Sequence, residues 1–216
     1  MELLELKELI KAIPVMNQAT RVNKESWSKK LKTDSTAKKE FDSIYPDSEC
    51  VITRKEILEE PDSKRKSMMT LMWGYPTGGR GNNISNILDK FDDLYGLLKR
   101  YDKEMDKEKF RNLLEEFKEI KGLGPSTWSK LLYFFNYSIE GNKCLIYDQK
   151  IVSSLNRKQF SELANDEKKY KQNKNDYLIY LRKIKEWAEK IDAKDSDLPD
   201  KIEVFLFYFN LYYKWD

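Results

Sequence analysis

The chain has 216 residues, of which 36% are charged, 40% hydrophobic and 13% aromatic, a balance that is typical of a folded protein with a sizeable core and excludes wholesale disorder. Its formal net charge of +3 gives no global signal for nucleic-acid binding, so any such surface must be a local one. The absence of histidine excludes Ser-His-Asp and Cys-His catalysis, and two cysteines, Cys50 and Cys144, are too few for a four-cysteine zinc or iron–sulfur site and favour a reducing cytoplasm.

The N-terminal residues predict a surface helix. Apolar side chains recur at helical spacing over residues 3–13, and Pro14 ends the run: they are Leu3, Leu6, Leu9, Ile10 and Ile13. Acidic and basic residues alternate through this segment, which excludes a signal peptide and a membrane span. Residues 23–49 are rich in Lys, Ser, Thr and Asp, and they suit irregular structure or short helices.

The middle of the chain contains a helix start and a glycine-rich loop. Thr53 and Glu56 have the spacing of a capping box, which predicts a helix from Thr53 onward. Residues 67–75 read as an apolar helix or a buried strand, and they run into the loop PTGGRGNN. This loop is not a P-loop, because the Lys-Ser/Thr pair is missing. The segment 84–101 after it predicts another helix.

Five further helices are predicted after this segment, so the predicted fold class is mainly α. Apolar residues trace one helix face over residues 110–120 and another over 128–135, with a glycine hairpin between them. We expect helices at 149–155 and 177–191, with a Lys/Asn/Asp-rich linker around 165–175. After Pro199 the chain reads as a terminal helix that is apolar on nearly all sides, with a strand as the alternative.

The hairpin sequence IKGLGPSTWSK places two glycines one residue apart. Gly122 suits a left-handed backbone that ends the first helix, and Gly124 lets another group approach the backbone closely. Pro125 suits the first turn of the next helix. The free amides of such a helix start can bind a phosphate oxygen without reading the base sequence. The alternative is a packed helical hairpin whose glycines only close a turn.

Three segments together resemble the helix-hairpin-helix DNA glycosylase superfamily, in its 8-oxoguanine DNA glycosylase branch. They are the glycine hairpin, CLIYDQKIVSSL with Asp148 at the position of the catalytic aspartate, and GRGNNISNILDKF, which is similar to the loop that enters the duplex. The resemblance covers roughly residues 67–155. The family's Gly/Pro-rich approach to the aspartate survives only as Gly141, with Leu145, Ile146 and Tyr147 where proline is usual.

The resemblance implies one domain over residues 1–216, with two helical lobes and a cleft between them. The hairpin unit would cover residues 108–136, and the N- and C-terminal helices would form the second lobe. It assigns DNA-backbone binding to Gly122, Leu123, Gly124, Ser126 and Thr127. It assigns the duplex wedge to Arg80, Asn82 and Asn83, although an ordinary glycine-rich turn is the alternative. For stacking on the extruded base we select Trp73, Tyr75, Phe205 and Phe209. We expect Tyr208, Tyr212, Tyr213 and Trp215 to belong to the core.

The resemblance also implies the chemistry. Asp148 would stabilise positive charge on the sugar or activate water, whereas the alternative is an N-cap for the helix that begins at Gln149. Bifunctional members carry a nucleophilic lysine two residues past the second hairpin glycine, and here that position is Ser126. We therefore predict a monofunctional enzyme, with Lys121, Lys130 and Lys150 as possible substitutes for that lysine. No cofactor or metal is expected, and a monovalent cation at the hairpin is the one ion that the resemblance allows.

Three functional hypotheses follow. The first is a monomeric cytoplasmic DNA glycosylase that acts on double-stranded DNA and touches no membrane, either in repair of damaged bases or in anti-phage defence against hypermodified bases. The second is a non-catalytic helix-hairpin-helix DNA-binding module that uses Asp148 only as a cap. The third is a helical interaction protein whose glycines serve packing, which would show no salt-dependent DNA binding.

Overall fold

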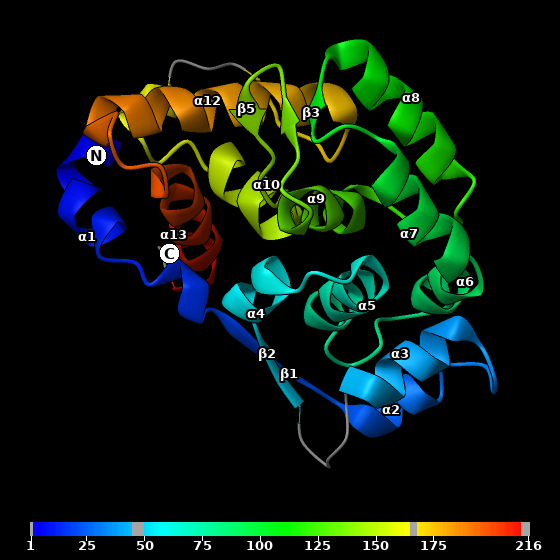
Figure 1. Ribbon diagram of the computed structural model, residues 1–216. Helices are drawn as coiled ribbons and strands as arrows, with labels where there is room; N and C mark the ends of the chain where they lie inside the picture. Colours follow the sequence, from blue (N-terminus) through cyan, green and yellow to red (C-terminus); the bar gives the residue numbers. More distant parts are fainter. Residues whose placement is uncertain (1, 45–49, 165–167, 213–216) are drawn as a thin grey trace.

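The computed structural model describes residues 2–44, 50–164 and 168–212 (Figure 1). Tyr213 and Trp215 lie outside these ranges, and so does the side chain of Tyr212. The helices are η1 (Leu3–Leu6), α1 (Lys7–Lys11), η2 (Val15–Asn17), α2 (Lys24–Ser28), α3 (Thr36–Ile44), α4 (Arg54–Glu59), α5 (Ser63–Gly74), α6 (Asn83–Asp89), α7 (Phe91–Arg100), α8 (Lys107–Lys118), α9 (Pro125–Phe134), α10 (Gln149–Asn156), α11 (Ser161–Ala164), α12 (Lys174–Asp192) and α13 (Leu198–Tyr212).

The predicted helical pattern is confirmed in most places. The capping box at Thr53 and Glu56 is present at the start of α4, and of the segment 67–75 all but the last residue belong to helix α5 and not to a strand. The terminal segment is helix α13. The single helix predicted over residues 84–101 is wrong in detail, because α6 and α7 are separate helices that meet at Lys90.

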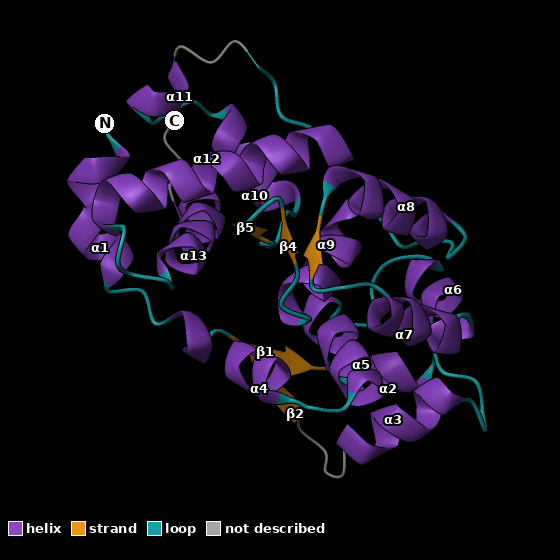
Figure 2. Cartoon of the chain, turned by 45° about the horizontal axis from the view of Figure 1, so that its top comes forward, coloured by secondary structure: helices purple, strands orange, loops and turns teal. Residues whose placement is uncertain are grey.

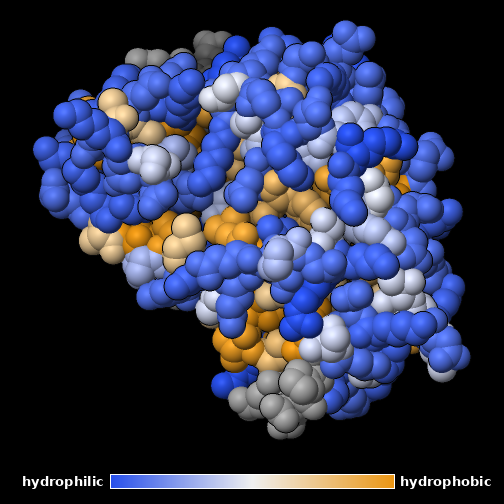
Figure 3. All heavy atoms as spheres, viewed as in Figure 1, coloured by the Kyte–Doolittle hydropathy of each residue, from blue (hydrophilic) through white to orange (hydrophobic). Residues whose placement is uncertain are grey.

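Two groups of helices face each other (Figure 1). In one group α5 packs against α3, α4 and α7, and in the other α13 packs against α1, α10 and α12. Helix α9 packs on α5, and its Trp128 ring lies 4.9 Å from the ring of Tyr177 on α12, so α9 touches both groups. The cleft between them is where the candidate site described below lies. Figure 3 shows apolar side chains gathered in the hollow of this face, while the surrounding surface is mainly hydrophilic.

Two small sheets brace these groups (Figure 2). The first pairs β1 (Ala19–Val22) with β2 (Cys50–Thr53) in antiparallel register, Thr20 opposite Ile52. The second is the three-stranded order β3 (Glu104–Met105), β4 (Ser138–Ile139), β5 (Asn142–Lys143). The sequence pattern does not predict the strands of the first sheet, because each is only four residues long and half exposed.

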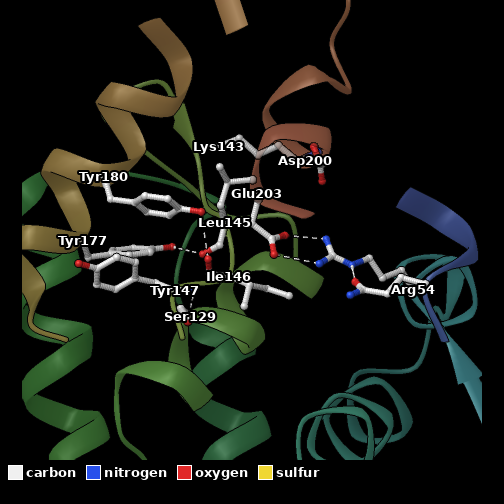
Figure 4. Close-up of polar contacts among 11 residues, drawn as sticks. Arg54, Ser129, Lys143, Leu145, Ile146, Tyr147, Tyr177, Tyr180, Asp200 and Glu203 are labelled. Atoms are coloured by element: carbon white, nitrogen blue, oxygen red, sulfur yellow. Dashed lines mark hydrogen bonds and ion pairs between the residues drawn. The ribbon is translucent and has the colours of Figure 1, made fainter. Parts of the chain in front are cut away.

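A buried ion pair links the two groups. Arg54 of α4 and Glu203 of α13 are both 0% exposed, and they form two contacts of 2.8 and 3.1 Å (Figure 4). Burial raises the pKa of Glu203, and the Arg54 guanidinium opposes that rise. The pair therefore fixes how α13 sits relative to α4. Within the described ranges, no helix is both long and apolar enough to cross a membrane.

Candidate active site

The two hairpin glycines have different roles. Gly122 has φ +93°, and a Cβ there would lie 2.7 Å from the Asn83 carbonyl oxygen, so this position must lack a side chain because the α6 backbone fills the space. Gly124 is the N-cap of α9 with φ −83°, and a Cβ there would meet no atom within 4 Å. Gly122 thus serves internal packing, and Gly124 leaves open space at the start of α9.

Most amides of the hairpin are used within the turn. The N–H groups of Leu123, Gly124 and Thr127 donate to backbone carbonyls at 3.1, 3.0 and 2.9 Å. The Ser126 N–H has no acceptor among the residues that the structure describes. Ser126 is therefore the amide best placed for a phosphate oxygen, and the wider set of backbone contacts predicted for the hairpin stays a prediction.

The predicted wedge loop lies directly beside the hairpin. Arg80, Asn82 and Asn83 are exposed, and no other described residue bonds their side chains. Asn82 stands at the N-cap position of α6 without making the usual side-chain cap bond. Lys30, in the turn after α2, donates to the Gly81 carbonyl at 2.9 Å and holds the loop in place. Three polar side chains are thus presented to solvent next to Gly122.

The segment that leads to Asp148 is held by side chains from two helices. The hydroxyls of Tyr177 and Tyr180 on α12 donate to the Leu145 and Ile146 carbonyls, both at 3.1 Å (Figure 4). The Tyr147 N–H donates to Ser129 Oγ of α9 at 3.0 Å. These bonds fix an extended backbone without the proline that is usual in the resembling family. The Ser129 bond also couples the hairpin helix to the residue before Asp148.

Asp148 is an N-cap and keeps one oxygen free. Its Oδ1 accepts from the Lys150 and Ile151 amides at 2.9 and 3.2 Å. No donor in the described part of the chain reaches Oδ2. The cap predicted as the alternative is therefore real. Because it occupies one oxygen only, it orients the carboxylate and does not exclude a chemical role.

A pocket of about 370 Å³ lies between the two helix groups and brings Asp148 and the hairpin helix together. Residues of β1, α5, α9, α10, α13 and the adjoining turns line it: Gln18, Ala19, Thr20, Trp73, Gly74, Pro76, Ser126, Lys130, Asp148, Lys150, Phe207 and Tyr208. A carboxylate, two amines and three aromatic rings thus converge on one cavity whose volume is typical of a ligand site.

The chain matches the family model described as "Putative 8-oxoguanine DNA glycosylase OGG-like protein" over residues 13–207. The chain belongs to this OGG-like family. Comparisons with curated proteins and with solved structures gave no significant match. The mainly helical architecture is that expected of an OGG-like glycosylase, and the family description indicates an enzyme that acts on DNA.

Of the four aromatic residues predicted for base stacking in this OGG-like protein, only Trp73 lines the pocket. Tyr75 lies at the end of α5, where its hydroxyl is 2.5 Å from Thr127 Oγ1 and its carbonyl accepts from Trp27. Phe205 and Phe209 pack on Phe160 in the core, with ring centroids 5.9 and 5.0 Å from it. None of these three residues lines the pocket, and their assignment to base stacking stays a prediction.

The rings on α13 that do line the pocket are Phe207 and Tyr208. Tyr208 is 37% exposed, so the prediction that it belongs to the core is also wrong. The ammonium of Lys150 lies over one face of the Phe207 ring, 4.4 Å from its centroid. Helix α13 is apolar on nearly all sides, so its sequence contained no signal for the face that meets the pocket.

Gln18 is a pocket residue that the sequence did not suggest. Its Oε1 accepts from Arg54 Nε at 2.6 Å, and its backbone carbonyl accepts from the Arg54 N–H at 2.9 Å. A guanidinium has no acceptor, so the amide nitrogen of Gln18 cannot occupy that place. The Gln18 NH₂ is therefore the group left to donate to a ligand in the pocket.

Ser126 stands two residues past the second hairpin glycine, where the resemblance places the lysine of the bifunctional glycosylases, but a lysine lies one helical turn away. Lys130 Nζ is 2.9 Å from the Ser126 carbonyl oxygen and 2.8 Å from Ser126 Oγ. Burial lowers the pKa of Lys130, and the negative charge of Asp148 opposes that shift. Within the described residues no three Cys, Asp and Glu side chains gather as a metal-binding group.

Proposed function

We propose that this OGG-like protein flips a damaged or modified base out of double-stranded DNA and hydrolyses its N-glycosidic bond, with Asp148 as the catalytic carboxylate. The observation that carries the proposal is the pocket shared by Asp148 and the first turn of α9. A helix start that grips the sugar-phosphate backbone would bring a neighbouring nucleotide to that pocket.

The free oxygen of Asp148 suits the chemistry of this bond. Cleavage builds positive charge on the sugar, and a carboxylate beside it stabilises the charge or takes a proton from water. Two amides hold Oδ1. The carboxylate is therefore already oriented before the substrate binds, which is the condition for effective electrostatic catalysis.

The pocket suits an extruded base. Its volume of about 370 Å³ lies near the lower end of the range for small-molecule sites, so it accommodates a base and not a base pair. Trp73 and Phe207 offer ring surfaces, while the Gln18 amide offers a donor to a base carbonyl or ring nitrogen. Arg80, Asn82 and Asn83 would fill the gap left in the duplex.

The product that we propose is an abasic site. Ser126 has no amine, so it cannot form the covalent intermediate that leads to strand cleavage. The polar pocket lining is compatible with an oxidised base, as in repair, and with a base bearing a polar substituent, as in defence against phage DNA. We propose that the enzyme acts as a cytoplasmic monomer. A monovalent cation at the hairpin stays a prediction.

The test is base release by the wild-type chain and by Asp148→Asn. Asparagine also caps helices well, so this variant keeps the N-cap and removes the charge. We expect it to lose base release by about 10²–10³-fold with little change in DNA affinity. Mass spectrometry of bases freed from genomic, oxidised and phage DNA measures release, and gel shift measures affinity.

The cap made by Asp148 also favours the second function, a DNA-binding module. Such a module would bind DNA in a salt-dependent manner and release no base, with or without the Asp148 charge. Base release by the wild-type chain that survives in Asp148→Asn would contradict the role of Asp148. Absence of both DNA binding and release would leave the interaction protein as the remaining hypothesis.

A further inference from the structure

Lys130 is a buried cation to which the mechanism above gives no role. The residue is 8% exposed, and none of the described carboxylates lies within 4.0 Å of its ammonium. Its two polar contacts are the carbonyl and hydroxyl oxygens of Ser126. Lysine is almost never buried without a paired charge, because desolvation of the ammonium costs several kcal/mol. Because this burial is costly, we expect Lys130 to have a function in the pocket.

The surrounding structure makes room for this side chain. Lys130 and Ser126 are four residues apart on α9, so the amine reaches back over one turn toward the start of the helix. A Cβ at Gly74 would lie 3.1 Å from Lys130 Cδ. Helix α5 therefore ends in a residue without a side chain where the lysine stem passes. Helices α9 and α5 therefore together fix the position of the Lys130 amine.

The amine has one hydrogen left for a ligand. An ammonium carries three donors, and Ser126 takes two of them. Lys130 and Asp148 line the same pocket. The charges of Asp148 and Glu203 favour the ammonium form, whereas Arg54 and Lys150 disfavour it. Burial is the largest influence and lowers the pKa, which makes the group a stronger proton donor than an exposed lysine.

We propose that Lys130 is the general acid of this glycosylase and protonates the departing base. The inference rests on the proposed function. The bond between the sugar C1′ and the base nitrogen breaks, its electron pair goes to the base, and the Lys130 proton goes to a nitrogen or oxygen of that base. Water adds its oxygen to C1′ and gives a proton to Asp148 Oδ2. Transfer of that proton to the neutral Lys130 amine restores the enzyme.

A general acid and a nucleophile require different protonation states of the Lys130 amine. A nucleophilic amine must be neutral, attacks C1′ itself and forms a covalent imine that borohydride traps. A general acid must be protonated and never bonds to the sugar. The acid role therefore predicts abasic DNA as the product and no trapped adduct, in agreement with Ser126 at the position of the family's lysine.

The experiment is single-turnover base release against pH, on whichever DNA the wild-type chain acts on in the mass-spectrometric screen. The wild-type rate should fall as the pH rises through the Lys130 pKa, at a pH below the 10.5 that is ordinary for lysine. Lys130→Gln should slow release by about 10²–10⁴-fold and lose this alkaline limb. Lys130→Arg keeps the charge but is a poor acid, so it should also be slow.

Three further measurements make the outcome decisive. Lys185→Gln, on an exposed position of α12, should keep the wild-type rate and pH profile. Gel shift on DNA with a stable abasic analogue should show wild-type affinity for Lys130→Gln, and circular dichroism should show that it is folded. If Lys130→Gln does not fold, Lys130→Arg and Lys130→Met take its place in the rate comparison. The fall of the wild-type rate at alkaline pH is measured on the wild-type chain alone.

The results that would overturn the inference are distinct from those that would overturn the proposed function. Release by Lys130→Gln at the wild-type rate, an unchanged alkaline limb in that variant, or a wild-type adduct trapped by borohydride that Lys130→Gln lacks would each refute the acid role and leave a glycosylase. No release by the wild-type chain from any of the DNAs would refute both.

Discussion

Helices α9 and α13 both line the pocket, yet their sequences differ in what they reveal. Helix α9 begins at Pro125, which follows Gly122 in a left-handed backbone and Gly124 at the N-cap position. Helix α13 is a run of apolar and aromatic residues interrupted by Asp200 and Glu203. The start of α9 was predicted correctly, and the pocket face of α13 was not. A short sequence motif is enough to predict local backbone geometry. Which side of a buried helix faces a pocket depends instead on the elements packed around it.

The largest expected loss of stability follows from replacing Glu203, the α13 carboxylate that pairs with Arg54. Glu203→Gln leaves Arg54 buried without its counter-charge, so we expect the free energy of unfolding to fall by about 3–5 kcal/mol. Urea denaturation measures this change. The double variant Arg54→Met with Glu203→Gln should recover part of the loss. A Glu203→Gln variant as stable as the wild type would show that α13 is held by its apolar contacts alone.

Alanine substitutions on the core face and on the pocket face of α13 should have different effects on stability and on base release. Phe205→Ala removes a ring that is 6% exposed and tilted against Phe160, and should cost about 3–5 kcal/mol of unfolding free energy. Phe207→Ala, at the half-buried pocket position, should cost less than half as much but weaken binding of the extruded base. Thermal unfolding and base release are the two measurements, and equal stability losses would contradict the assignment of faces.

The two hairpin glycines that precede α9 provide a matched pair of substitutions. Gly122→Ala must adopt a left-handed backbone against Asn83, so we expect at least about 1–3 kcal/mol of destabilisation. Gly124→Ala should change stability by no more than about 1 kcal/mol, because no atom lies where its Cβ would be. If a phosphate approaches Gly124, this second variant should instead bind DNA about 10-fold more weakly. Unchanged DNA affinity would argue against the phosphate contact.

A smaller loss of stability is expected at Ser129 than at Glu203 or Phe205. Ser129→Ala leaves the buried Tyr147 N–H without an acceptor, and should cost roughly 1–2 kcal/mol. Base release should fall more than stability alone explains, because Tyr147 precedes Asp148. Ser154→Ala is the control, since its hydroxyl donates to the Leu206 carbonyl at 2.6 Å, away from this segment. Equal rates for the two variants at a temperature where both are folded would exclude a positioning role for Ser129.

The sequence by itself determined the helical class, the capping box at Thr53, the left-handed turn at Gly122 and the cap at Asp148. Each of these depends on residues within four positions of one another, so the physical cause lies in the local backbone. Membership in the OGG-like family is likewise carried by the sequence.

Only the tertiary structure decided what meets in the pocket. Gln18, Lys130 and Phe207 come from three parts of the chain, and nothing in their own neighbourhoods marks them as partners of Asp148. The orientation of Gln18 follows from Arg54, and the path to Asp148 follows from Tyr177 and Tyr180 on α12. These contacts join residues far apart in sequence, and they form only when helix packing fixes which side of each helix is buried.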